Sequence, residues 1–156
     1  KAKRDDAMGC VTLAIAEAAH MGNASSASDA MALAMGCAEQ VAKQNEAGAA
    51  AAKQMQTVAI STWTKLINDS AAQLSVDDRS DAMANLRSAL DEADRHNDAL
   101  AIAEKQRTLL DETASKAASP LAASTYNWPR AEVYVYLGRA LDIAPVLVAS
   151  ANALPT

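Results

Sequence analysis

The sequence of 156 residues contains no phenylalanine and has few aromatic residues of any kind, with two Trp and three Tyr. Strands draw heavily on aromatic and β-branched residues, so this composition argues against a β-sandwich or a βαβ enzyme. Proline is also scarce, and all four prolines fall in the last 37 residues. Because proline interrupts helices, its absence before Pro120 predicts long helices there.

Positive charge is in deficit, since 14 basic residues face 19 acidic ones and give a net charge of −5. That balance argues against a nucleic-acid-binding surface. In the second half of the chain the basic residues alternate with acidic ones, which predicts pairing between helices or between subunits. Those residues are Arg79, Arg87, Arg95, Lys105 and Arg107.

Recognisable catalytic motifs are missing as well. The sequence has no Gly-x-Ser-x-Gly, His-Glu-x-x-His, Cys-x-x-Cys or glycine-rich phosphate loop. Glu17-Ala-Ala-His20 has the spacing of a di-iron ligand pair, but the second Glu-x-x-His unit is absent. No run of about 18–20 uncharged apolar residues predicts a transmembrane helix. We therefore expect no enzyme, no cofactor and no metal site.

What the chain has in abundance is alanine, which accounts for 39 of its residues. Alanine favours helices that pack closely through small side chains. Loop residues at 22–26 and a capping-box pattern at Ser75-Val-Asp-Asp78 divide the chain into helices expected over about 2–21, 27–74 and 76–118. The fold class is thus all-α, with long antiparallel helical hairpins in an elongated bundle or coiled coil. Whether the second helix continues through Gly48 is left open.

The third expected helix carries a coiled-coil pattern. Its residues at 3-4-3-4-3 spacing are Met83, Leu86, Leu90, Ala93, Asn97 and Leu100. Asn97 at an a position would fix the register or the number of partner helices. The alternative is that Asn97 faces solvent on a slightly rotated helix.

A short repeat contains both cysteines, since Ala7-Met-Gly-Cys10 recurs as Ala34-Met-Gly-Cys37. In an antiparallel hairpin centred near residue 24, Cys10 and Cys37 lie level. Gly9 and Gly36 beside them allow the two helices to approach closely. We predict a disulfide between Cys10 and Cys37, which implies an oxidising compartment such as the periplasm or the exterior. Two buried free thiols are the alternative.

Composition changes after residue 118, so residues 1–118 and 119–156 are expected to form separate parts. Four aromatic residues gather in the second part: Tyr126, Trp128, Tyr134 and Tyr136. Asn127-Trp128-Pro129 favours a helix start capped by Asn127, whereas the alternation over 133–137 leaves open a strand hairpin with 146–148. The aromatic residues either contact a membrane or a partner, or cover the open end of the bundle.

Long helices with few large apolar residues give one chain a thin core, so copies of the chain are expected to pack together. In composition the chain is similar to internal virion and ejection proteins of tailed phages, and components of bacterial envelope tubes fit almost as well. We expect a non-enzymatic structural subunit of a homo-oligomeric ring, tube or sheath, with other structural proteins as partners, in a virion or the bacterial periplasm or cell envelope. The alternative is a monomeric periplasmic four-helix bundle that binds a small ligand, a metal or a client protein.

Overall fold

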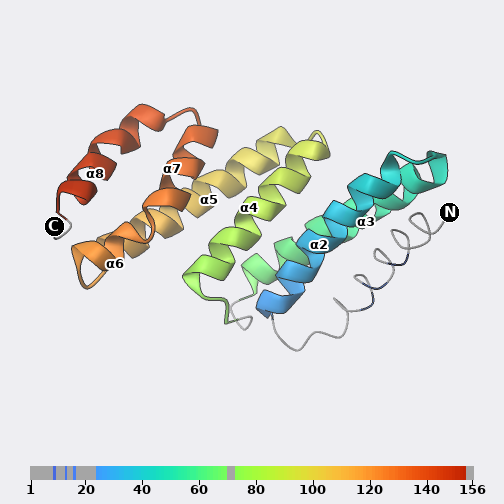
Figure 1. Ribbon diagram of the computed structural model, residues 1–156, viewed down its shortest axis with the longest axis horizontal. Coiled ribbons are helices and arrows are strands. Elements are labelled where there is room, and N and C mark those ends of the chain that lie inside the picture. The colour runs from blue at the N-terminus through green and yellow to red at the C-terminus, as the bar shows by residue number, and fades with distance from the viewer. Residues whose placement is uncertain (1–8, 10–12, 14–15, 17–23, 70–72, 154–156) are drawn as a thin grey trace. The chain divides into compact units, whose positions relative to one another are not determined.

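The computed structural model describes residues 9, 13, 16, 24–69 and 73–153, and over these residues it is helical without any strand. This confirms the all-α class. The chain divides into two compact units, residues 1–94 and 95–156 (Figure 1). The boundary expected from composition, between residues 118 and 119, falls inside the second unit. The helix expected over about 2–21 lies almost entirely outside the described residues.

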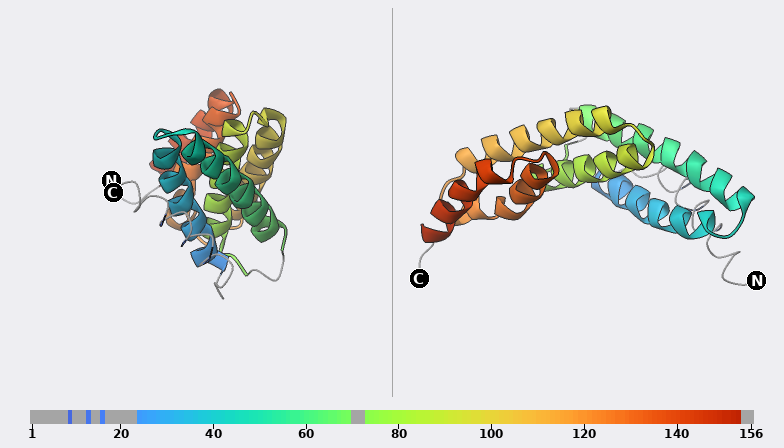
Figure 2. Two further views of the ribbon diagram at one scale, coloured as in Figure 1. Left: turned by 90° about the vertical axis from the view of Figure 1, so that its right-hand side faces the viewer. Right: turned by 90° about the horizontal axis from the view of Figure 1, so that it is seen from above.

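The first unit contains α2 (Ala24–Ala42), α3 (Glu46–Asn68) and α4 (Val76–Glu92). Helices α2 and α3 lie side by side along their length (Figures 1 and 2), and α4 packs against both. The core combines alanines with a few large side chains, so the helices approach closely where small residues face each other. The largest side chains that are fully buried in this unit are Trp63, Met31, Met55, Leu86 and Val41.

The single helix expected over about 27–74 is wrong, because the chain reverses at residues 43–45. Asn45 has an extended backbone, and its side chain accepts a 2.8 Å hydrogen bond from the Gly48 amide. Asn45 thereby caps α3 and satisfies one of the amides at its start. Gly48 lies within α3, and a Cβ built there would overlap the Val41 carbonyl group. The glycine therefore allows the close approach of α2 to α3 and does not interrupt a helix.

Helix α4 begins where the sequence predicts. Ser75 accepts a 3.0 Å hydrogen bond from the Asp78 amide, and its hydroxyl donates to the Asp78 carboxylate at 2.8 Å. Ser75 therefore caps α4, while the Asp78 carboxylate bonds the Ser75 hydroxyl and not the Ser75 backbone amide that it would bond in a full capping box. The expected continuation to residue 118 is wrong, because α4 ends at Glu92 and Asp94 has a φ of 58°. A left-handed residue ends the helix, and Asp is one of the few non-glycine residues that adopt this conformation readily.

The coiled-coil pattern is consequently split between two helices. Met83, Leu86 and Leu90 are buried on α4 in the first unit. Asn97 and Leu100 lie on the next helix, where both are exposed. No uninterrupted seam runs through the six positions.

The second unit contains α5 (His96–Ser115), α6 (Pro120–Ser124), α7 (Asn127–Tyr136) and α8 (Ala140–Asn152). Helix α7 packs against α5 on one side and against α8 on the other. A core cluster of α5, α7 and α8 residues holds the three helices together. Its members are Ala103, Leu110, Val133, Tyr134 and Ile143.

The strand hairpin considered for 133–137 and 146–148 is wrong, since both segments are helical apart from the helix-ending residue 137. Val133 and Tyr134 are adjacent and both buried, as a helix face permits and strand alternation would not. Gly138, with a φ of 68°, ends α7. Asn127 does not cap α7, because it is the first helical residue and its amide donates to the Ser150 hydroxyl at 2.8 Å.

The helix positions also expose a longer repeat in the sequence. Ser28-Asp-Ala-Met-Ala32 recurs without change as Ser80-Asp-Ala-Met-Ala84. With the same offset, Lys53-Gln54 matches Lys105-Gln106. Equivalent positions on α2 and α4 are buried in both copies: Ser28 and Ser80, Met31 and Met83, Ala34 and Leu86, Ala38 and Leu90. The chain therefore contains an internal sequence repeat, in which 28–54 and 80–106 each span a helix, a short break and the start of the next helix.

Candidate functional site

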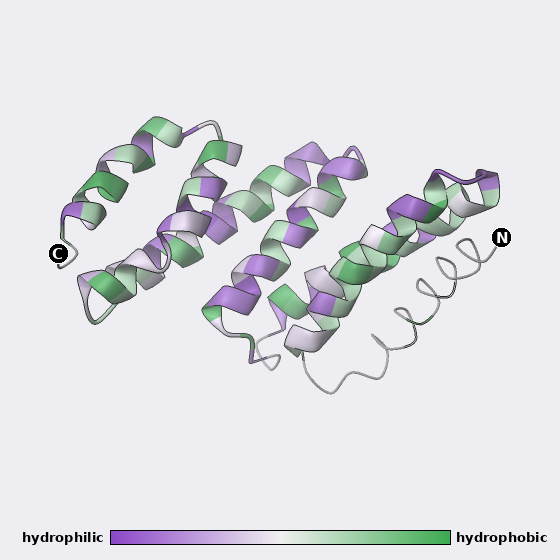
Figure 3. Ribbon diagram, viewed as in Figure 1, coloured by the Kyte–Doolittle hydropathy of each residue, from purple (hydrophilic) through white to green (hydrophobic). Residues whose placement is uncertain are grey.

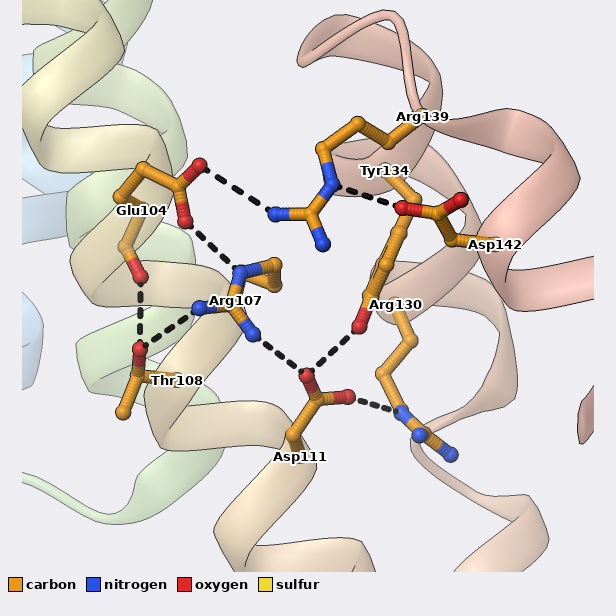
Figure 4. A network of polar contacts seen from close by, with 8 residues as sticks. All are labelled: Glu104, Arg107, Thr108, Asp111, Arg130, Tyr134, Arg139 and Asp142. Atoms are coloured by element: carbon orange, nitrogen blue, oxygen red, sulfur yellow. Dashed lines mark hydrogen bonds and ion pairs between the residues drawn. The ribbon is translucent and has the colours of Figure 1, made fainter.

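A network of polar contacts joins three elements of the second unit, and Asp111 on α5 lies at its centre (Figure 4). Asp111 Oδ1 accepts a 2.9 Å hydrogen bond from Arg130 Nε on α7. Asp111 Oδ2 accepts from Tyr134 Oη at 2.8 Å and from Arg107 Nη1 at 3.0 Å. Two charged donors and one neutral donor thus converge on a single carboxylate. Such charge-assisted hydrogen bonds are stronger than neutral ones, so Asp111 connects α7 firmly to α5.

Glu104 connects α5 to the segment before α8. Its Oε2 accepts a 2.7 Å hydrogen bond from Arg107 Nε, and its Oε1 lies 3.5 Å from Arg139 Nη1. The hydrogen bond from Arg107 is the main reason that the pKa of Glu104 is lower than usual. Arg139 also donates from Nε to Asp142 Oδ2 at 2.8 Å in the first turn of α8. That hydrogen bond is the main cause of the raised pKa of Arg139.

Two of these cations lie close to the ring of Tyr134. The guanidinium carbons of Arg107 and Arg139 are 6.0 and 5.5 Å from the ring centroid. Both distances are within the range at which a cation is attracted to an aromatic face. Tyr134 is buried, so its hydroxyl and ring anchor α7 to α5 and to the start of α8. The network is a structural cross-link that fixes the orientation of α8.

Helix α8 is apolar around nearly its whole circumference. Its thirteen residues include a single charged one, Asp142. Ile143 and Leu147 face the core of the second unit, but Leu141, Pro145 and Val148 lie on the opposite side and are exposed. Figure 3 shows the contrast between the mostly hydrophobic colouring of α8 and the mixed colouring of α5. A helix that is hydrophobic all round normally lies in a protein interior.

Large apolar side chains are also exposed on the neighbouring elements of the second unit. Trp128 is 79% exposed on α7, where Val135 is exposed as well, and α6 contributes Leu121. Isolated exposed leucines are common on soluble proteins, whereas a cluster of them within one small unit marks an interaction surface. The candidate functional site is therefore the outward apolar face of α8, and the exposed side chains on α6 and α7 add further apolar surface to the same unit.

The four aromatic residues expected at a membrane or partner contact have different environments. Trp128 points outward, and Tyr134 is buried in the polar network. Tyr126 and Tyr136 are half-buried against the core cluster. Only Trp128 among the four is placed to reach a partner directly.

The cysteine pair predicted between the first two helices cannot be followed, because Cys10 lies outside the described residues. Cys37 is half-buried on α2. Gly36 is exposed, and a Cβ at Gly36 or Gly9 would meet nothing within 4 Å. The disulfide and the close packing of the two glycines remain predictions.

The described residues contain no cluster of three or more His, Cys, Asp or Glu side chains that would hold a metal ion. Within that same part of the chain, no helix is long and apolar enough to cross a membrane.

Sequence reasoning missed two of these features. The first is Asp111. Arg107 follows Glu104 by three positions and precedes Asp111 by four, which is the spacing of paired charges on one helix face. The second is the outward face of α8, which the near-absence of charge over residues 140–152 could have revealed. No protein-family model matches the chain, and no curated protein or solved structure does either.

Proposed function

We propose that the chain is a non-enzymatic structural subunit of a homo-oligomeric helical assembly. The observation that supports this most directly is α8, whose apolar surface is covered on one side only by the described residues. Burial of apolar surface drives most protein association. A subunit whose core is completed by neighbouring copies is therefore expected to expose such an apolar helix on its own surface.

The polar network supports a structural role for the second unit. Asp111 and Glu104 on α5 bond Arg107 of the same helix, and they also bond Arg130 on α7 and Arg139 before α8. Ion pairs between helices stabilise the packing of those helices against one another. In this proposal the network holds α8 in place while its outer face binds a neighbour.

A protein partner fits the outward surface better than a lipid membrane. Helices that lie on membranes carry Lys and Arg on their polar face, which attract anionic lipids. Residues 120–152 contain only Arg130 and Arg139 as basic residues, and both are bonded to carboxylates. Exposed Trp128 is the single feature that suits a membrane interface. Flotation with liposomes tests this alternative, and co-flotation of the assembled protein would favour it.

The setting we propose is a virion or the bacterial cell envelope, where the product is a ring, tube or sheath. This part rests on the alanine-rich composition and on the predicted Cys10–Cys37 bridge, which requires an oxidising compartment. Intact-mass analysis after alkylation without reductant tests the bridge. A chain that takes up no alkylating reagent agrees with it, and two alkylated thiols would contradict it.

The test of the assembly is light scattering after size exclusion, at two protein concentrations. One chain has a mass of 16.2 kDa. We expect a mass of several chains that persists or grows with concentration. A mass of one chain at both concentrations would contradict the proposal and favour the monomeric helical bundle that binds a ligand or client.

A further inference from the structure

We propose that Gly138 is a conformational hinge, and that residues 127–144 have a second conformation in which α7 continues past Gly138 as one straight helix along α5. In the structure the chain instead folds back at residues 137–139, so that α8 packs against α7. Both conformations involve the second unit alone. The hinge goes beyond the proposed function, because it operates whether or not the chain assembles.

The sequence of this region repeats that of α4. Residues 79–93 align with 130–144 without a gap, and six of the fifteen positions are identical. The identical residues are Arg79, Leu86, Ala89, Leu90, Asp91 and Ala93, which match Arg130, Leu137, Ala140, Leu141, Asp142 and Ala144. With the same offset, the first residue of α4, Val76, corresponds to the first residue of α7, Asn127. The two helices therefore begin at equivalent positions, but α4 spans 17 residues and α7 spans 10.

Burial follows the pattern of α4 before the hinge and departs from it afterwards. Tyr134 is buried like its counterpart Met83, whereas Leu141 is 88% exposed although its counterpart Leu90 is buried. A straight helix would place Leu141 on the same face as Tyr134 and Leu137, because these positions are spaced by three and four residues. The sequence thus retains the apolar stripe of one long helix, and the fold-back leaves the second half of that stripe uncovered.

The contacts between α5 and α7 give the register in which the straight helix would lie (Figure 4). Arg130 bonds Asp111 at 2.9 Å. The ring of Tyr134 lies near Arg107, whose guanidinium carbon is 6.0 Å from the ring centroid. Four positions forward on α7 therefore correspond to four positions back on α5, as expected for antiparallel neighbours.

Leu100 is the residue of α5 that the straight helix would cover. Seven positions, about two helical turns, lead forward from Tyr134 to Leu141. The same step back along α5 leads from Arg107 to Leu100, which is 45% exposed. The straight conformation therefore brings two exposed leucines of the same chain together, and no outside partner is needed to cover them.

Glycine at position 138 accounts for the fold-back. Gly138 has a φ of 68°, and its amide donates to the Val135 carbonyl at 3.0 Å. The next amide, of Arg139, donates to the Tyr134 carbonyl at 2.8 Å. These two bonds form a Schellman motif, which ends a helix at glycine. The equivalent residue of α4 is Arg87, which favours a helix and disfavours the left-handed conformation.

The folded-back conformation has weak points that straightening would relieve. Asn127 donates from Nδ2 to Ser150 Oγ at 2.8 Å, but its Oδ1 is buried without a hydrogen-bond partner among the described residues. An unpaired buried oxygen is unfavourable and would gain water once the two ends separate. Within the polar network only the contacts of Arg139 hold α8 in the folded-back orientation. Its pair with Glu104 is 3.5 Å long and nearly half exposed, so it contributes little.

Pro145 marks where the straight helix would end. Within α8 this proline removes the hydrogen bond that the Leu141 carbonyl would otherwise accept. In the alignment with α4, Pro145 corresponds to Asp94, which lies just beyond the end of that helix. Helices usually end before a proline. The straight conformation therefore ends at a proline, whereas the folded-back one contains it, and in exchange the folded-back one buries Ile143.

The hinge controls the candidate functional site. In the folded-back conformation Leu141 is the most exposed large side chain on the outward face of α8. In the straight conformation the same side chain lies against Leu100. Straightening thus withdraws part of the apolar face when no partner covers it.

Pairs of introduced cysteines trap each conformation in the full chain. Asn127→Cys with Ser150→Cys bridges the folded-back form, because the two side chains are in contact. Leu100→Cys with Leu141→Cys bridges the straight form. Leu100→Cys with Val148→Cys is the matched control, since Val148 is exposed on α8 but lies beyond the end of the straight helix. Mass spectrometry after mild oxidation maps each bridge apart from the native cysteines and selects intramolecular products by the mass of one chain.

The rates of bridge formation report how often each conformation occurs. In the starting chain both the 127–150 and the 100–141 bridges are expected, the second more slowly because it traps the minor state. The 100–148 control is expected to be slower again by at least about tenfold. Gly138→Ala disfavours the left-handed turn and favours a helix, so the ratio of 100–141 to 127–150 rates is expected to rise about thirtyfold. Gly138→Asn tolerates the left-handed conformation and is expected to change the ratio by less than about fivefold.

NMR tests the straight helix without introduced cysteines. In the Gly138→Ala chain, methyl contacts between Leu100 and Leu141 are expected, which a merely unfolded α8 would not give. Far-UV circular dichroism verifies that the variant keeps its helix content.

Three results would overturn the hinge. The first is a 100–141 pair that bridges no faster than the 100–148 control, and the second is a rate ratio that Gly138→Ala leaves unchanged. The third is a Gly138→Ala chain without the methyl contacts, which has lost α8 and has not straightened it. Each measurement is made within one chain, so failure of the proposed assembly leaves the hinge standing, and failure of the hinge leaves the assembly standing.

Discussion

Gly48 in the first turn of α3 lies against the carbonyl group of Val41 at the end of α2, so closely that no Cβ fits between them. The side chain of Val41 is within contact of the same point. The turn between the two helices is therefore compatible with glycine and with no other residue at position 48. This contact places Asn45 where its side chain caps α3.

We predict that Gly48→Ala destabilises the first unit by about 1–3 kcal/mol, as expected when a methyl group is forced into a packed interior. Gly36→Ala is the matched control, because position 36 is exposed within α2 and a Cβ there meets nothing within 4 Å. That change is expected to stabilise the helix by up to about 1 kcal/mol. Urea unfolding followed by the fluorescence of buried Trp63 measures both.

The control also tests the close packing predicted for Gly36. If Gly36→Ala destabilises the chain, a helix approaches that position closely, as the sequence repeat around the cysteines predicts. If Gly48→Ala leaves the unfolding midpoint unchanged, the contact with Val41 does not limit the turn.

Capping residues in the sequence predict a helix start correctly where the capping hydrogen bonds join residues that are close in the chain. Ser75 caps α4 at the expected residue because its hydroxyl and the Asp78 carboxylate bond within four positions of each other. No comparable signal marks the turn at residues 43–45, because the glycine in this region, Gly48, lies beyond the turn and inside α3. The structural role of that glycine depends on α2, which lies alongside only after the chain has turned.

The second break was harder to predict. Ala93, Asp94 and Arg95 all tolerate a helix, and the coiled-coil spacing continues through them. Propensity and spacing thus favoured one helix, and tertiary packing overrides such weak preferences. The charge pattern on α5 predicts that Arg107 is paired. It does not predict the contacts with α7, because Arg130 and Tyr134 are 19 and 23 positions from Asp111 in the sequence.

We predict that Asp111→Asn destabilises the second unit by about 1–3 kcal/mol. The substitution removes the carboxylate that bonds Arg130 and one of the two carboxylates that bond Arg107, and both guanidinium groups are partly buried. Far-UV circular dichroism during urea unfolding measures the loss. The fluorescence of Trp63, measured with Trp128→Phe in both proteins so that it reports on the first unit alone, is expected to keep its midpoint.

Glu112→Gln is the matched control for that change. Glu112 pairs with Lys116 at 3.5 Å, and both side chains are mostly exposed. Exposed pairs contribute little, so the effect is expected to stay within about 0.5 kcal/mol. Equal effects of the two substitutions would contradict a structural role for the network.

We predict that Ser28→Ala destabilises the first unit by about 1–3 kcal/mol, since it removes the acceptor of the Trp63 indole N–H, which donates to Ser28 Oγ at 3.1 Å. Both side chains are buried, so the indole N–H would lose its partner without gaining water. Ser28→Thr keeps an acceptor and serves as the comparison. The indole N–H resonance in NMR is expected to shift in the alanine variant, and an unchanged resonance would count against the bond.

Glu92 on α4 gives the chain a pH dependence of known sign. Burial raises the pKa of its carboxyl group, the negative charge of Glu39 on α2 raises it further, and a hydrogen bond with Ser88 acts in the opposite direction. Because the folded state holds the proton more tightly than the unfolded chain does, this group favours folding below its unfolded pKa. This contribution to stability is lost as the pH rises through the folded pKa, so at neutral pH the ionised carboxylate of Glu92 destabilises the folded state.

Glu92→Gln is therefore expected to stabilise the first unit at pH 7, by about 0.2–0.5 kcal/mol given that solvent screens the pair. Glu39→Gln removes the same repulsion from the other side, so the double variant is expected to gain less than the sum of the single gains. Unfolding midpoints at pH 7 and below about pH 4 measure the effect, which is expected to vanish at the lower pH, where the carboxyl groups are protonated. A gain that is equal at both values, or single effects that add fully, would show that Glu92 and Glu39 do not interact.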